Sequence, residues 1–201
     1  MRRTGSAALN GYDLALLLHI AGIVALFCVM ALLLGALGGM RRAQSAQALR
    51  EWLRQAVLME RLVAPLGLLA FLPAAYMVSD RWSWRDGWVN AALIGLLVTI
   101  ALGPLLLRGR LLAARRKLEG VADGAPPLPA RLTATDPALW VASQMMTTLP
   151  SGILVLMVFK PNGAVSALIL VLAGLLGVCA AAPALSRYRR LEAEAAGQRP
   201  A

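Results

Sequence analysis

Apolar residues in this chain are gathered into five long runs rather than spaced along amphipathic faces. Each run is close to the ~20 residues that a helix needs to cross a hydrocarbon core ~30 Å thick. The runs are continuously apolar and lack the alternation of barrel strands, so they predict helices. The sequence therefore predicts an all-α fold, an integral membrane bundle of five transmembrane helices. The predicted spans cover residues 14–37, 62–78, 88–107, 137–159 and 164–185.

The polar segments differ in character. In residues 43–60, apolar side chains recur at i, i+3, i+4, i+7 and i+8 from Leu49, which predicts an amphipathic cytoplasmic helix on the membrane or extending the second span. Residues 120–136 are rich in proline and predict a flexible cytoplasmic linker. Residues 191–201 are polar and alanine-rich and predict a disordered cytoplasmic tail. Residues 1–190 then form a single transmembrane domain.

Basic residues are divided unevenly between the two ends of the predicted bundle. Of the 20 lysines and arginines, fifteen follow the first, third or fifth span. The positive-inside rule places these in the cytoplasm, which predicts an outside N-terminus and a cytoplasmic C-terminus. At the opposite end, Trp82, Trp84 and Trp88 indicate a membrane boundary, because amphipathic rings favour the headgroup layer. The five basic residues at that end are Arg2, Arg3, Arg81, Arg85 and Lys160.

Composition narrows the class of partner. Hydrophobic residues make up 59% of the chain and charged residues 15%, against roughly 45–50% and about 25% in a globular domain. A formal charge of +10 on a soluble basic face would predict nucleic-acid binding. Here the basic residues lie between apolar runs, where they meet anionic headgroups. We therefore expect a lipid bilayer with anionic headgroups as partner, and no nucleic acid.

Few side chains in the predicted spans could act in catalysis, bind a metal or carry an ion. The sequence carries no catalytic motif, nucleotide-binding loop or metal-ligand spacing, which predicts a non-enzymatic protein. The acidic residues Asp13, Glu60 and Asp136 fall at span ends, which argues against ion-driven transport. Cys28 and Cys179 each lie alone inside a span, and we expect them to be buried as small apolar side chains.

His19 is the single histidine of the chain and lies about two turns inside the first span. A membrane haem or copper site needs two or more good ligands. One hypothesis is that His19 and a methionine such as Met77 or Met145 bind copper or haem. The other is a neutral imidazole that donates a hydrogen bond to a neighbouring helix. The second, which we favour, predicts neither a metal nor another cofactor.

The fourth span carries the most informative polar pattern. Five hydroxyl or amide side chains stand at i, i+1, i+4, i+5 and i+8, on one helical face near the middle of the membrane. They could line a path for a small polar substrate, water or an ion. They could instead form a packing seam, with hydroxyls bonded back to their own helix and Gln144 joining two spans. We favour the seam. This polar stripe consists of Ser143, Gln144, Thr147, Thr148 and Ser151.

Segments of the first 120 residues carry a family resemblance. They are LLLHIAG (Leu16–Gly22), Arg41–Arg42, LVAPLGLLAF (Leu62–Phe71), WRDGWVNAALIG (Trp84–Gly95) and LLLRGRL (Leu105–Leu111). The chain resembles an uncharacterised bacterial family, a domain of unknown function of small predicted integral membrane proteins. It is more loosely similar to the membrane domain of copper-resistance proteins of the CopD type. In that comparison His19 is the matching residue, and the further histidines of such a site are lacking.

These observations predict a multi-pass protein, which the resemblance assigns to the bacterial inner membrane. We expect it to be a subunit or partner of another membrane protein, a homo-oligomer, or a permease-like component. The alternative is a copper- or haem-binding membrane protein that uses His19.

Overall fold

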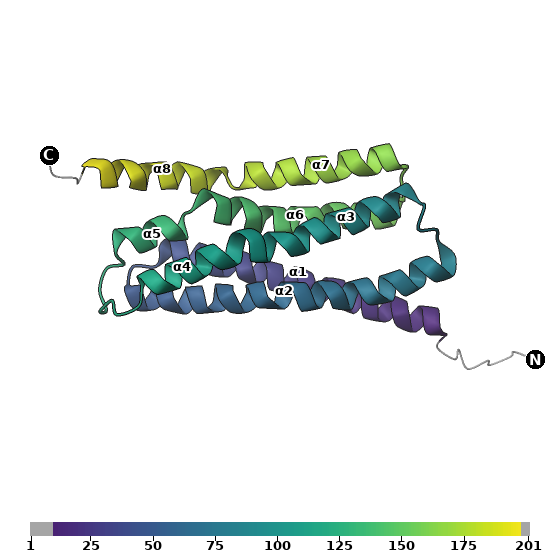
Figure 1. Ribbon diagram of the computed structural model, residues 1–201, viewed down its shortest axis with the longest axis horizontal. Coiled ribbons are helices and arrows are strands. Elements are labelled where there is room, and N and C mark those ends of the chain that lie inside the picture. The colour runs from purple at the N-terminus through teal and green to yellow at the C-terminus, as the bar shows by residue number, and fades with distance from the viewer. Residues whose placement is uncertain (1–9, 198–201) are drawn as a thin grey trace, which may run out of the picture.

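The computed structural model describes residues 10–197, and every element in that range is a helix. Figure 1 shows the long helices running side by side along one axis. Five helical stretches are long and apolar enough to cross a membrane, which confirms the predicted all-α class and number of candidate spans for the described residues. The elements are α1 (Gly11–Arg42), α2 (Ala46–Arg81), α3 (Gly87–Leu102), the π-helix η1 (Gly103–Arg108), α4 (Gly109–Lys117), α5 (Leu128–Ala134), α6 (Pro137–Phe159), α7 (Gly163–Ala180) and α8 (Ala182–Gly197).

Side-chain caps explain where four of the long helices begin. The amide oxygen of Asn10 accepts a hydrogen bond from a first-turn backbone N–H of α1, and Asn162 does the same for α7. The hydroxyl of Ser45 caps α2, and the carboxylate of Asp136 caps α6. Each cap satisfies a backbone donor that has no partner within its own helix.

Helix α2 joins two segments that the sequence predicts separately. The predicted amphipathic helix and second span form one continuous helix of 36 residues. Leu49, Leu53 and Ala56 are buried in the bundle. The ring of Trp52 lies against Gly39 of α1, so a Cβ atom placed on Gly39 would come within 2.2 Å of the ring. The amphipathic segment is therefore the first part of the same helix as the second candidate span.

The proline-rich linker differs from the prediction in two ways. Its second half contains α5, because Pro129 lies in the first turn, where its missing N–H costs no hydrogen bond. Its first half is attached to α2: Arg50 donates to the carboxylate of Asp123 at 3.1 Å and to the carbonyl of Val121. The backbone N–H of Ala46 also donates to the carbonyl of Gly124, at 2.8 Å.

The chain beyond Leu191 also differs from the prediction. Residues 191–197 continue helix α8, where the sequence predicts disorder. Alanine and glutamate are good helix formers, and the side chain of Leu191 is buried. Residues 198–201 of the predicted tail lie outside the described residues.

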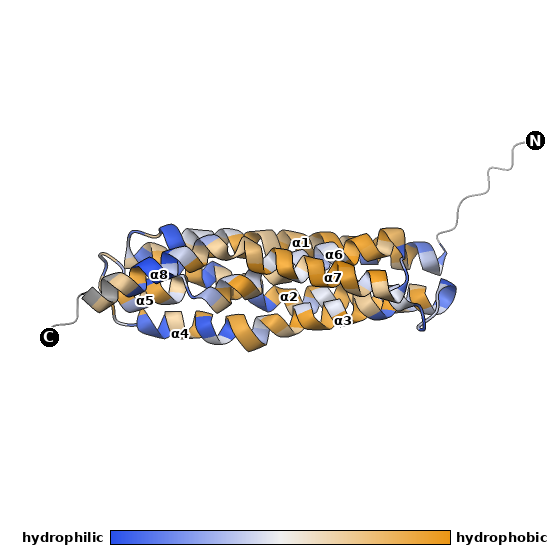
Figure 2. Cartoon of the chain, turned by 90° about the horizontal axis from the view of Figure 1, so that it is seen from above, coloured by the Kyte–Doolittle hydropathy of each residue, from blue (hydrophilic) through white to orange (hydrophobic). Residues whose placement is uncertain are grey.

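The outer face of the bundle is apolar. Many large hydrophobic side chains of α1, α3 and α7 are exposed, and Figure 2 shows hydrophobic colour along the middle of the bundle with hydrophilic patches toward its ends. Exposed apolar surface of this extent is typical of a membrane protein. Cys28 and Cys179 belong to this outer face, so the expectation that they are buried is wrong.

The packed core lies toward one end. We call the end with Trp82, Trp84 and Lys160 the tryptophan end, and the end with α4, α5 and α8 the basic end. The larger cluster of buried side chains joins α1, α2, η1, α4, α5, α6 and α8 and lies mostly in the basic half. A smaller cluster of Ala92, Ile153 and Leu156 joins α3 and α6 in the tryptophan half.

Candidate functional site

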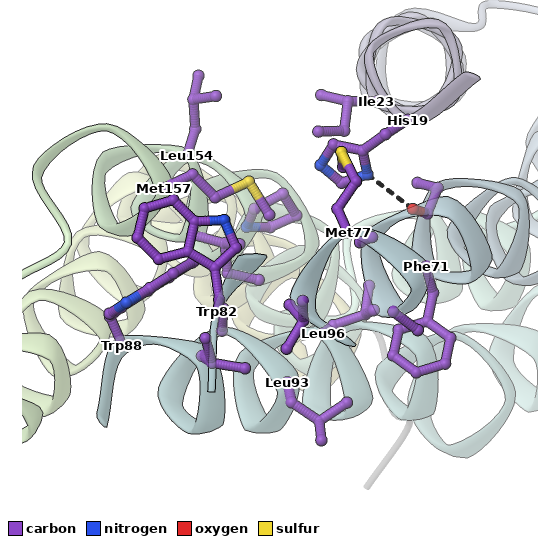
Figure 3. A pocket seen from close by; sticks show the side chains of 18 of the residues that line it. His19, Ile23, Phe71, Met77, Trp82, Trp88, Leu93, Leu96, Leu154 and Met157 are labelled. Atoms are coloured by element: carbon purple, nitrogen blue, oxygen red, sulfur yellow. Dashed lines mark hydrogen bonds between the residues drawn. The ribbon is translucent and has the colours of Figure 1, made fainter. Parts of the chain in front are cut away.

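A cavity of about 280 Å³ lies in the tryptophan half, between α1 and α2 on one side and α3 and α6 on the other. In Figure 1 the chains of α2 and α3 separate as they approach the tryptophan end. Most of the lining is apolar, and Figure 3 shows the side chains around the cavity. Representative lining residues are Ile23, Phe71, Leu93, Leu96, Ile153 and Leu154.

His19 is the buried polar group of this cavity. Its Nδ1 lies 2.7 Å from the carbonyl oxygen of Ala70 on α2. A carbonyl can only accept, so Nδ1 carries a proton; in the neutral tautomer with this proton, Nε2 keeps a lone pair. In Figure 3 the ring nitrogen that is not bonded to Ala70 points toward the space between the helices. The interhelical hydrogen bond expected from the sequence is therefore present.

Gly22 brings the two helices close enough for this bond. It lies one turn after His19, and a Cβ atom on it would stand 3.0 Å from the backbone nitrogen and Cα of Ala70. The bare backbone of α1 thus packs directly on the residue whose carbonyl accepts from His19. A larger residue at Gly22 would push the helices apart at this level.

Two thioethers share the cavity with His19. Met77 of α2 and Met157 of α6 both line it, and Figure 3 shows Met77 beside the imidazole. Of the two methionines considered from the sequence, the structure thus brings Met77 to His19, whereas Met145 lies against Gly174 and Gly177 of α7. Within residues 10–197, no three His, Cys, Asp or Glu side chains gather as a metal site.

Aromatic rings and cations surround the cavity at the tryptophan end. Trp82 and Trp88 meet edge to face, with ring centroids 5.5 Å apart. The ammonium of Lys160 lies 4.3 Å from the Trp82 ring centroid, and the guanidinium of Arg81 lies 3.8 Å from that of Tyr12. Lys160 is the left-handed cap that ends α6, with φ 45°. These cation–π contacts connect α1 to the last residue of α2, and the end of α6 to Trp82 directly after α2.

The polar stripe lies apart from this cavity, since none of its five residues is among the lining residues. Its hydroxyls bond to their own helix: Ser143 to Trp140, Thr147 to Ser143, Thr148 to Gln144 and Ser151 to Thr147, at 2.9–3.2 Å. Ser143 is buried and Ser151 is exposed. The hydroxyl of Thr148 lies 2.7 Å from the Cβ position of Gly177 on α7. This geometry supports the seam.

Glu60 is the residue whose environment sequence reasoning missed. From the sequence it falls at a span end, but the structure buries its side chain, leaving 6% exposed. Oε2 is the one buried side-chain nitrogen or oxygen of the described residues that has no hydrogen-bond partner. Apolar residues three and four positions away, Ala56, Val57 and Val63, were the available signal.

Comparisons with protein-family models, with curated proteins and with solved structures found no significant match to this chain.

Proposed function

We propose that this protein is a non-enzymatic, permease-like membrane component, or a subunit of a membrane complex, that binds a small and largely apolar molecule in the cavity of the tryptophan half. The observation that carries the proposal is the cavity of about 280 Å³, whose mostly apolar walls hold the ring of His19 with Nε2 not bonded to Ala70. Ligand pockets are typically apolar, with a small number of placed polar groups that orient the ligand. A ligand with one N–H or O–H donor suits this arrangement.

Thiol labelling tests the proposal. Ala74 lines the cavity and is half-buried, so we would introduce Ala74→Cys after replacing Cys28 and Cys179. We expect a small aqueous thiol reagent to label this cysteine from one side of sealed vesicles. Indole, an apolar probe with one N–H donor, should slow the labelling in a saturable way. This protection should be weaker in His19→Phe. Ala142→Cys, at a fully buried position, is the unlabelled control. Equal resistance of both cysteines would contradict the proposal.

A copper site is the second candidate, because Nε2 of His19 and the thioethers of Met77 and Met157 share the cavity. Imidazole and thioether are ligands that suit Cu(I). Haem suits the site less well, since axial ligands stand on opposite faces of the macrocycle, whereas Met77 lies beside His19 in Figure 3. Anaerobic Cu(I) titration against a chromophoric chelator separates the candidates. Copper binding predicts stoichiometric uptake that His19→Ala and Met77→Leu weaken and Met145→Leu preserves.

We infer a bacterial inner-membrane location with the N-terminus outside and the C-terminus cytoplasmic. The excess of basic residues at the basic end supports this orientation. A reporter that fluoresces only in the cytoplasm should be bright when fused after Arg190 and dark when fused after Lys160. The opposite pattern would reverse the orientation.

We infer further that anionic lipid headgroups bind at the basic end. A groove of about 800 Å³ between α2 and α4 is lined by Arg50, Arg54, Arg61 and Arg115. Basic pockets between helices on the cytoplasmic side bind such headgroups. Vesicles that contain phosphatidylglycerol should therefore stabilise the protein more than purely zwitterionic vesicles, and Arg61→Gln with Arg115→Gln should reduce the difference.

A further inference from the structure

Glu60 of α2 lies in the basic half, well separated along the helix from the cavity. Arg81 ends the same helix 21 residues later, which is about 31 Å at 1.5 Å per residue. This distance matches the thickness of a hydrocarbon core, so Glu60 lies at the level of the opposite membrane boundary. Its carboxyl is nonetheless turned into the bundle, where Oε2 has no hydrogen-bond donor. An ionised carboxylate without a donor is strongly disfavoured in such a place.

The carboxyl packs against the start of the π-helix η1. Oε1 lies 3.3 Å from the position that a Cβ atom of Gly103 would occupy, and the methyl group of Met146 lies 3.7 Å from the same point. Gly103 thus leaves the space that the carboxyl fills. The next residue, Pro104, has no N–H, so a carbonyl of the preceding turn lacks its helical donor. Short π-helical turns occur frequently at functional sites.

Polar side chains one turn from Gly103 and Met146 are bonded within their own helices. The buried hydroxyl of Thr99 donates to the carbonyl of Gly95, and that of Ser143 donates to the carbonyl of Trp140. These protons are therefore not directed at Glu60. Two cations belong to the same two elements, Arg61 of α2 and Arg108 at the end of η1. Their charge disfavours a metal cation at this position and would stabilise a carboxylate that came within their reach.

We propose that Glu60 is a proton-binding site. The carboxyl holds its proton while it is buried against Gly103. When water reaches the carboxyl from the basic end, the O–H bond breaks, the proton passes to water, and Arg61 and Arg108 stabilise the carboxylate. The ligand of this site is a proton exchanged with the basic end, and the proposal does not depend on what the cavity binds.

Dicyclohexylcarbodiimide tests the site, because this apolar reagent modifies protonated carboxyls in low-dielectric surroundings. The full-length protein in lipid vesicles would be treated over a range of pH and examined by intact mass and peptide mapping. We expect one adduct, at Glu60, whose formation slows as pH rises. The near-isosteric Glu60→Gln should lose the adduct. Glu51→Gln, which removes an exposed carboxyl paired with Arg54, should keep it.

Infrared difference spectroscopy provides a second measurement that does not depend on reagent access. A carbonyl stretch of a protonated carboxylic acid should be present in the wild type, disappear in Glu60→Gln and persist in Glu51→Gln. Absence of both the adduct and this band in the folded protein would overturn the proposal. Slowing of the labelling by Na⁺ at constant pH and ionic strength would also overturn it, because the site would then bind a metal cation.

Discussion

The basic half and the tryptophan half of the bundle are packed in different ways. In the basic half, large side chains from four elements fill the space between the helices; Leu37, Leu107, Leu111 and Met146 are each fully buried. In the tryptophan half, the buried cluster has three members, and a cavity separates α1 and α2 from α3 and α6. The same helices therefore form a packed core at one end and an open site at the other.

Small residues hold the two helices of a pair close together, so the two halves of the bundle differ in the space between the pairs. Helices α1 and α2 stay close along their length, at Gly22 against Ala70 and at Gly39 against Trp52. Helices α6 and α7 are equally close where Gly152 meets Ala173. Lipid tails are as apolar as leucine, so a gap between the pairs is not closed by a hydrophobic force. Helix pairs can therefore remain intact while the space between them opens toward a ligand.

The largest expected effect is in the basic half. Leu37→Ala removes a fully buried side chain of the main core and should lower the free energy of unfolding by about 2–3 kcal/mol, chiefly through lost packing. Leu96→Ala, at the half-buried cavity wall, should cost less than half as much, since an adjoining space already exists. Denaturant unfolding in matched micelles measures both. Equal losses would mean that the halves are packed alike.

The next largest effect is expected when a larger side chain forces α1 and α2 apart. Gly22→Val places a branched side chain against the backbone of Ala70, where even a Cβ atom has only 3.0 Å. We expect a loss of about 1–3 kcal/mol from overpacking, together with loss of the His19 hydrogen bond. The control is Gly38→Ala on the same helix, because a Cβ atom there meets nothing within 4 Å. A neutral Gly22→Val would show that the pair is loose at this level.

Removal of the imidazole should have a smaller effect. His19→Ala deletes one interhelical hydrogen bond of 2.7 Å, and such bonds in membranes contribute ~0.6–2 kcal/mol. Thermal unfolding monitored by tryptophan fluorescence provides the measurement. His19→Asn, which retains a donor on a shorter side chain, should recover part of the loss. Stoichiometric Cu(I) uptake by the wild type that is lost in His19→Ala would instead favour the metal site.

The helical architecture was readable from the sequence because a membrane span depends on a run of similar residues rather than on particular ones. The runs predict five helices of spanning length, and five candidates are present in the described residues. The predicted boundaries of the individual segments were less accurate. Proline at the start of α5 is compatible with a helix, whereas the proline content of the linker predicts none. The segment before the second span lacked any signal to end a helix, so α2 continues through it.

The candidate site was only partly readable, because it depends on distances between helices. The spacing of His19 and Met77 along the chain does not reveal that they share a cavity, which results from the divergence of two helix pairs. The burial of Glu60 depends on Gly103 and Met146, which come from other segments. The polar stripe shows the opposite case. Its back-bonding depends on i−3 and i−4 neighbours alone, and a single helix is enough to predict it.

The polar stripe should give the smallest effect and the sharpest distinction from the cavity. Its four hydroxyls are satisfied within α6. Gln144 is only half-buried, so Gln144→Leu should change stability by less than about 0.6 kcal/mol if the stripe is a seam. In a background lacking Cys28 and Cys179, Thr147→Cys and Ser151→Cys should resist aqueous thiol reagents. Exposure of Ser151 then means contact with lipid, which keeps a thiol protonated and unreactive. Ala74→Cys in the cavity should be labelled under the same conditions. Rapid labelling at both stripe positions, slowed by a polar solute, would instead place a water-filled path along α6.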